Sequence, residues 1–112
     1  MAGTDTEVHM CDAAVTLAFS VLGKRWNGMI VATLGSGPAP FVALRRAVTG
    51  ISDTVLSDRL AELGQAGLVA RTVDAGPPIT VTYSLTESGE GLVPILSRLG
   101  EWASANLQVP AH

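Results

Sequence analysis

The amino-acid sequence predicts one small domain of the mainly helical α+β class. The chain has 112 residues, which is the length of a single domain with one modest core. Five stretches place apolar residues at the three- and four-residue intervals of a helix that is buried on one side. Between residues 68 and 85 the pattern changes to β-branched, partly alternating residues, which is typical of strands.

The first two helices are expected over residues 12–22 and 24–34. Asp12 can cap the start of the first helix, and Gly23 ends it. This helix is apolar nearly all round, so it must be covered on more than one side. Gly28 costs the second helix roughly 1 kcal/mol relative to alanine, which indicates either an irregular helix or a close helix contact. The residues of the second helix expected to point inward are Trp26, Ile30, Thr33 and Leu34.

Two short helices joined by a tight glycine turn follow the break at residues 35–38. The first spans residues 41–48, and the second runs from the expected N-cap Ser52 to Ala66. Gly50 supplies the turn between them, and this arrangement is typical of a helix-turn-helix. Their inward residues are expected to be Phe41, Leu44, Val48, Val55, Leu56, Leu60 and Leu63.

A hairpin and a closing helix complete the predicted fold. Residues 68–73 and 79–85 are the expected strands of a two-stranded β-hairpin, with a long tip between them. Thr86 then caps a last helix that ends near Leu107, with Pro94 expected to delay its regular start or to kink it. Three helices, a hairpin wing and a closing helix together predict a winged helix-turn-helix with terminal dimerisation helices.

The distribution of charge points to a nucleic acid more clearly than the total does. The net charge is −3, yet six of the seven basic residues lie in residues 24–71, which carry only three acidic ones. A local positive face of this kind suits contact with phosphates, although an ordinary solvated surface would have the same composition.

The second helix of a helix-turn-helix enters the major groove, and its first residues reach the base edges. Arg45, Arg46 and Arg59 would hold the DNA backbone, which positions the protein without reading sequence. Two plainer roles remain open: Asp53 and Asp58 can simply stabilise the positive end of the helix, and Arg59 can pair with Glu62 or Asp58 on the surface. The predicted DNA-contacting residues are Arg45, Arg46, Ser52, Thr54, Val55, Ser57, Asp58, Arg59 and Arg71.

An ordered set of motifs resembles the HxlR-type winged-helix regulators, which are related to the MarR-like superfamily. The resemblance covers residues 11–105 and implies a bacterial, cytoplasmic regulator, expected to be a repressor, whose homodimer binds a two-fold DNA operator. Members often carry basic residues where this chain has Thr54 and Ile79, so contact of the wing with DNA rests on backbone amides and Arg71. The matching motifs are Cys11, VLGKRW at residues 21–26, FVALRR at 41–46, GIS at 50–52, LSDRLAEL at 56–63, GLVAR at 67–71 and YSLT at 83–86.

The resemblance also implies that the first and last helices pair two chains. The high apolar content, 47 % of residues, agrees with burial between chains. We expect a flexible arm over residues 1–10, the winged-helix domain over residues 11–107 and a tail over residues 108–112. Trp26 and Trp102 are interpreted as core or interface residues rather than as ligand stackers. The residues expected at the dimer interface are Val15, Leu17, Phe19, Leu22, Leu96, Leu99 and Trp102.

Cys11 is the only cysteine, which fits a reducing cytoplasm. Relatives that sense oxidants or electrophiles use a cysteine at this N-terminal position, so the resemblance implies a redox or ligand-sensing role for Cys11. Asp12 opposes formation of the reactive thiolate, and a disulfide would need a partner subunit or a small thiol. The alternative is a small apolar residue at the dimer seam.

The sequence gives less support to other classes of function. His9 and His112 lie near the two ends, so we expect no catalytic triad, metal cluster or cofactor, and no enzyme. No signal peptide or membrane span is expected. Two alternatives remain: a winged helix used for protein contacts with weak DNA binding, and a regulator that binds a small-molecule effector in an apolar pocket at the dimer interface. The central basic cluster favours DNA.

Overall fold

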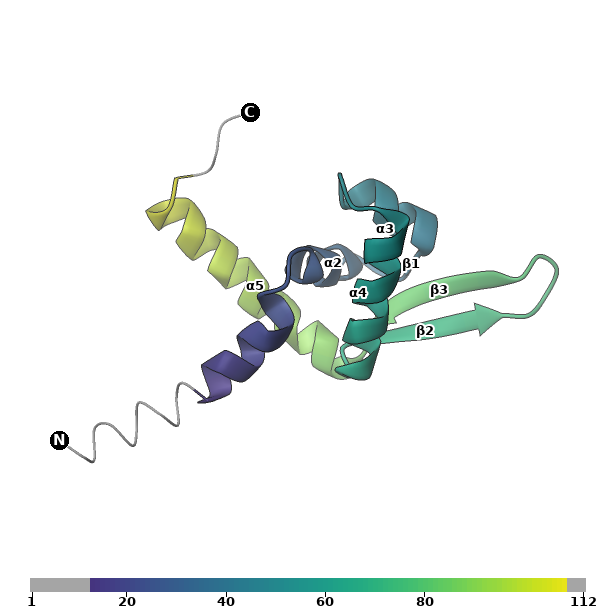
Figure 1. The fold of residues 1–112 in the computed structure, drawn as a ribbon, viewed down its shortest axis with the longest axis horizontal. Helices are drawn as coiled ribbons and strands as arrows, with labels where there is room; N and C mark the ends of the chain where they lie inside the picture. The colour runs from purple at the N-terminus through teal and green to yellow at the C-terminus, as the bar shows by residue number, and fades with distance from the viewer. Residues whose placement is uncertain (1–12, 109–112) are drawn as a thin grey trace.

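The computed structural model describes residues 13–108 and confirms the mainly helical winged helix-turn-helix (Figure 1). None of the helices in this part of the chain has the length and apolar content needed to span a bilayer. A helical segment over residues 13–22 is followed by α2 (Asn27–Leu34), β1 (Ala39–Pro40), α3 (Phe41–Ala47), α4 (Asp53–Gln65), β2 (Val69–Asp74), β3 (Thr80–Leu85) and α5 (Glu87–Asn106).

The sheet contains the predicted hairpin and a third strand that the sequence did not indicate. Its strands are antiparallel in the order β1-β3-β2. Across the hairpin Val69 lies opposite Leu85 and Arg71 lies opposite Tyr83, while Ala39 of β1 pairs with Tyr83 from the other side. The predicted two-stranded hairpin wing is therefore confirmed, and only the added strand β1 was missed, because its two residues are too few to show an alternating pattern.

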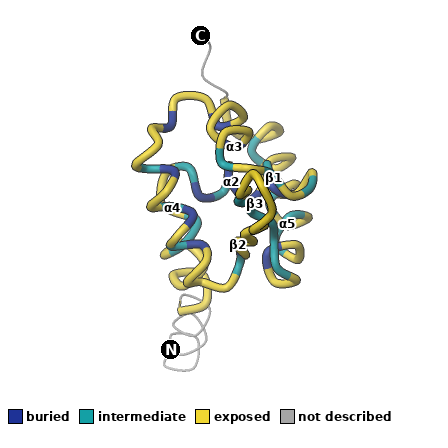
Figure 2. Tube along the Cα trace, turned by 90° about the vertical axis from the view of Figure 1, so that its right-hand side faces the viewer, coloured by how far each residue is buried: buried dark blue, intermediate teal, exposed yellow. Residues whose placement is uncertain are grey.

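The core lies where α2, α3, α4 and the start of β2 meet. Figure 2 shows the buried positions on the inner sides of these elements, while their outer sides are exposed. Leu44 and Leu56 are fully buried and join the two helices of the helix-turn-helix. This core anchors one side of α4, and the opposite side of the helix is exposed. The buried apolar residues are Ile30, Val31, Leu34, Leu44, Val48, Ile51, Leu56, Leu60, Leu63 and Val69.

The second helix begins at Asn27, so the prediction of a start at Lys24 was wrong. Trp26 precedes the helix in a left-handed conformation with φ 87°, which L residues seldom adopt. Its indole packs partly against the core, and the Arg25 guanidinium lies 4.3 Å from the ring centroid. Gly28 has open space where a Cβ would lie, so it does not mark a close helix contact.

Helix α5 begins beside the end of α4 and the base of the wing, and from there α5 and the N-terminal helical segment point away from α4 and the wing (Figure 1). Helix α5 runs without a break through Pro94, so the proline does not delay its start. The radius of gyration is 16.7 Å, whereas a compact domain of this length has a value of about 13 Å. The terminal helices therefore extend outward from the core.

Candidate nucleic-acid interface

Helix α4 is anchored on one side and polar on the other. The Ser52 hydroxyl accepts a hydrogen bond from the backbone N–H of Val55 at 3.2 Å, which confirms Ser52 as the N-cap. Leu56, Leu60 and Leu63 are buried on the inner side of the helix. Three of the predicted DNA-contacting residues, Thr54, Ser57 and Asp58, are exposed, whereas Val55 is half-buried against the core.

An ion pair lies beside the start of α4. The Arg45 Nη1 of α3 lies 3.1 and 3.3 Å from the two carboxylate oxygens of Asp53. Both side chains are exposed, so this pair adds little stability. Its main effect is to position Arg45. The Asp53 carboxylate is favourable at the positive end of α4 and holds the Arg45 guanidinium beside it. The neighbouring Arg46 is exposed and has no ion pair among residues 13–108.

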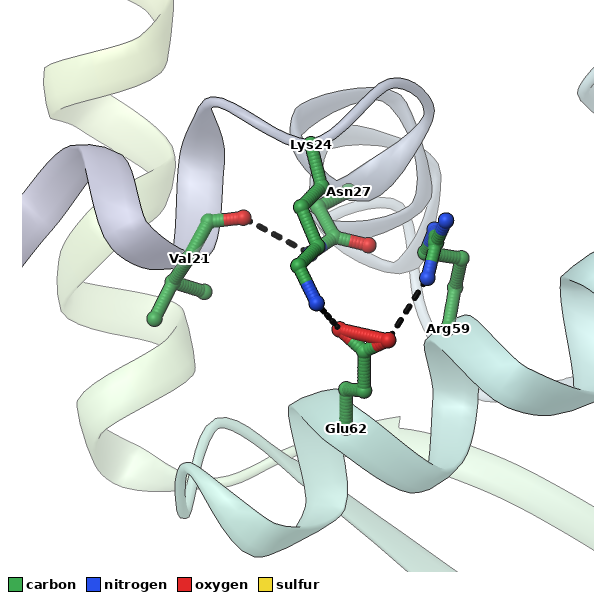
Figure 3. Close-up of polar contacts among 5 residues, drawn as sticks. All are labelled: Val21, Lys24, Asn27, Arg59 and Glu62. Atoms are coloured by element: carbon green, nitrogen blue, oxygen red, sulfur yellow. Dashed lines mark hydrogen bonds and ion pairs between the residues drawn. The ribbon is translucent and has the colours of Figure 1, made fainter.

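Glu62 joins two cations on the flank of α4 (Figure 3). Its Oε2 lies 2.8 Å from the Lys24 Nζ, and its Oε1 lies 2.6 Å from the Arg59 Nη1. The hydrogen bond from Lys24 is the main cause that lowers the pKa of Glu62. Desolvation opposes it, while the charges of Lys24 and Arg59 and the hydrogen bond from Arg59 lower the pKa further. Glu62 therefore stays ionised at neutral pH, and we name this Lys24–Glu62–Arg59 group the Glu62 fork.

The Glu62 fork bears on both interpretations of Arg59, as an ion-pair partner and as a phosphate contact. Pairing with a glutamate was one alternative from the sequence, and the structure has this pair. Arg59 is also partly buried, and its Nε has no hydrogen-bond partner among the described residues. Arg59 is therefore less available for phosphate than Arg46 or Arg71. The contact of Lys24 with Glu62 was missed, because the two residues are 38 positions apart and no local pattern links them.

A buried amide ties α2 to the N-terminal helical segment. Asn27 is 1 % exposed, and its Nδ2 donates a hydrogen bond to the Val21 carbonyl oxygen at 2.7 Å. The Oδ1 of Asn27 is buried and has no partner in the described part of the chain. This contact fixes the end of the terminal segment close to the Glu62 fork (Figure 3).

The other predicted site residues lie in two places. Arg71 is exposed on β2, beside α4. The residues expected at a dimer interface lie on the terminal helices, where Leu17 is 70 % exposed, Phe19 56 % and Trp102 55 %. Cys11 lies outside the described residues. No three potential metal-binding His, Cys, Asp or Glu side chains gather within residues 13–108.

Comparison with known proteins agrees with this geometry. The family model described as HxlR-like helix-turn-helix matches residues 21–110. The HTH-type transcriptional regulator YodB of Bacillus subtilis is 42 % identical over 86 residues, which are 77 % of this chain and 77 % of YodB.

Two solved structures of the B. subtilis regulator YodB are also similar to this chain. The reduced form has a TM-score of 0.77 at 38 % identity and covers 86 % of this chain and 94 % of that one. The quinone-bound form has a TM-score of 0.72 at 38 % identity and covers 82 % of this chain and 96 % of that one. The chain therefore belongs to the HxlR-like helix-turn-helix family, whose members are DNA-binding transcriptional regulators and not enzymes.

Proposed function

We propose that this regulator acts in the cytoplasm as a homodimeric repressor that places one α4 helix of each chain in the major groove of a two-fold operator. The observation that carries this proposal is the exposed polar start of α4, which is capped by Ser52 and held from behind by buried leucines. Ser52, Thr54 and Asp58 are the side chains within reach of base edges, and Ser57 lies on the flank of α4 that faces the wing. Arg45, Arg46 and Arg71 supply the cations that hold the flanking phosphates.

Gel-shift titration with the region upstream of its own gene tests DNA binding. We expect a discrete complex whose affinity falls as salt rises, because each phosphate neutralised releases counterions. Arg46→Gln should weaken the complex and make its salt dependence shallower. Arg98→Gln removes an exposed cation from α5 instead and should change neither property. Binding that is absent, or that does not respond to salt, would contradict the proposal.

The proposed dimer uses the surface formed by the terminal helices. Val15, Leu17 and Phe19 leave much apolar area exposed on residues 13–22, and Leu99 and Trp102 do so on α5. An almost wholly apolar groove of about 370 Å³ adjoins this surface; it is lined by Leu17, Ala18, Val21, Leu22, Ala66, Leu68 and Leu92. Exposed apolar area of this extent is costly in water, so a second copy covering it would be stabilising. Two-fold pairing would set the two α4 helices about 34–36 Å apart, which is one DNA turn.

Glu62→Gln should make binding to DNA tighter and more dependent on salt. The substitution removes the charge that holds Lys24 and Arg59, so both cations become free to meet phosphate. We expect the salt slope to steepen by up to about 0.9 for each new phosphate contact. Fluorescence anisotropy with a random-sequence duplex measures both quantities.

Glu101→Gln is the matched control for Glu62→Gln, since it removes an exposed carboxylate from α5 without touching the Glu62 fork. If the two variants bind DNA alike, the Glu62 fork does not restrain Lys24 and Arg59.

The proposed regulation by an effector depends on Cys11, which lies outside the described residues. A structure of the similar regulator YodB is quinone-bound, and the proposal for this chain is that electrophiles or oxidants modify Cys11. The Cys11→Ser protein should then bind DNA as the wild type does, but diamide or a quinone should no longer release it from the operator. Anisotropy of a labelled operator, with and without oxidant, measures this; dithiothreitol should restore binding only after diamide treatment of the wild type. Equal release of both proteins would reject Cys11 as the sensor.

A further inference from the structure

A groove of about 400 Å³ lies between α4 and the wing. Ser57, Ala61 and Gln65 line it from the helix, and Arg71 and Tyr83 line it from the sheet. Helix α4 packs against β2 at the base of the wing, and from there the two elements diverge (Figure 1). The groove is therefore bounded on one side by the proposed recognition helix and on the other by the hairpin.

The register of the hairpin brings Arg71 and Tyr83 to the same face of the sheet. The two residues lie directly opposite each other on β2 and β3. Val69, two residues before Arg71, is buried against the core, and side chains two apart on a strand share a face. The face toward α4 is therefore apolar at the core and becomes polar at the Arg71–Tyr83 pair.

The side chains that line the groove suit an elongated ligand that carries negative charge along one edge. No acidic residue lines it, and Arg71 has no ion pair within residues 13–108. The Tyr83 hydroxyl and the exposed Ser57 hydroxyl have no hydrogen-bond partner in the described part of the chain, so both are free to donate. Leu60 and Val69 add apolar surface between these donors.

The molecule that would occupy the groove between α4 and the wing can be inferred from how closely a helix fits the major groove of DNA. A helix of about 10–12 Å diameter fills a major groove of about 12 Å, so a phosphate backbone runs along each side of it. We infer that the backbone on the wing side enters this groove, where Arg71, Tyr83 and Ser57 hold one phosphate and the apolar floor packs against the adjoining deoxyribose. The inference rests on the proposed function and adds Tyr83 to the DNA-contacting residues. Since the contact is to the backbone, it sets the position of α4 without reading sequence.

Tyr83→Phe removes only the hydroxyl and is the first test. We expect about 100-fold weaker binding by the dimer, to operator and unrelated duplex alike, because each dimer loses two hydrogen bonds to charged phosphates. The salt slope should not change, since the lost donor is neutral. Arg71→Gln should instead reduce the slope by about 0.9 for each chain. Thr82→Val is the matched control, because it removes a hydroxyl from the opposite face of the same strand.

A scan with single methylphosphonate substitutions in the duplex identifies the phosphate. Neutralising the contacted phosphate should weaken the wild type and leave the already weakened Arg71→Gln and Tyr83→Phe proteins nearly unaffected. The inference is overturned if Tyr83→Phe binds as Thr82→Val does, or if no phosphate gives this pattern.

It is also overturned if both variants bind duplex normally but lose a thermal stabilisation by p-cresol, since the groove would then hold a small aromatic molecule. Failure of the proposed function is distinct, because the wild type itself would bind no duplex.

Discussion

Leu99→Asp should convert the dimer into a monomer that no longer binds a two-fold operator. Leu99 lies on α5, where it remains 47 % exposed in the single chain beside Ile95 and Trp102. In the proposed dimer a carboxylate at this position would be buried among apolar side chains without a cation to pair with it. We expect association to weaken by about 100-fold or more, since an unpaired buried polar group costs about 3 kcal/mol. Sedimentation equilibrium and operator anisotropy measure the two effects.

Ser97→Asp is the control for this prediction. Ser97 is exposed on the same helix, about 160° around the axis from Leu99 at 3.6 residues per turn. It should leave both the dimer and DNA binding intact, and circular dichroism should show that both variants stay folded. A Leu99→Asp protein that remains dimeric, or that binds the operator as tightly as the wild type, would mean that α5 does not pair the chains.

Gly89→Ala should be among the most destabilising single substitutions in the described part of the chain. Gly89 is buried in the first turn of α5, and a Cβ there would lie well inside van der Waals contact with the Leu68 carbonyl oxygen and close to Leu85. The backbone cannot easily yield, because the Thr86 N–H donates to that same Leu68 oxygen at 3.0 Å and the Thr86 hydroxyl donates to Gly67 at 2.6 Å. We expect a loss of about 3 kcal/mol in the free energy of unfolding, measured by urea denaturation.

Gly91→Ala, two residues further along α5, is the matched control. A Cβ at Gly91 meets nothing within 4 Å. Alanine should therefore stabilise the helix by up to about 1 kcal/mol through its better helix propensity. Equal effects of the two substitutions would show that Gly89 is not a point of close approach between α5 and the turn before β2.

Local patterns were sufficient to predict the helix-turn-helix and its recognition helix. The cap at Ser52 and the leucines that follow it are signals within one segment, so α4 begins where the sequence indicates. The hairpin was predictable for the same reason, to within one residue at the strand ends. The cap at Thr86 likewise marks the start of α5, and its hydroxyl accepts a hydrogen bond from Gly89.

The features that the sequence did not reveal depend on contacts between distant segments. Strand β1 exists because Ala39 and Pro40 lie beside β3, and the late start of α2 accompanies the left-handed Trp26 packed on the core. In the sequence Gly89 is only a residue of low helix propensity. The structure shows that the Leu68 carbonyl oxygen lies where a Cβ of residue 89 would have to be. The proposed role of Tyr83 likewise requires the register of the hairpin and the position of α4.

Hydroxyl-radical footprinting of the wild-type protein on its upstream region tests the central claim most directly. We expect two protected patches related by two-fold symmetry and centred about one helical turn, roughly 34–36 Å, apart. Each patch should include the backbone on both sides of one major groove, as an inserted α4 flanked by the wing requires. A single protected patch, or protection whose spacing is not a whole number of turns, would contradict a dimer that reads DNA through two α4 helices.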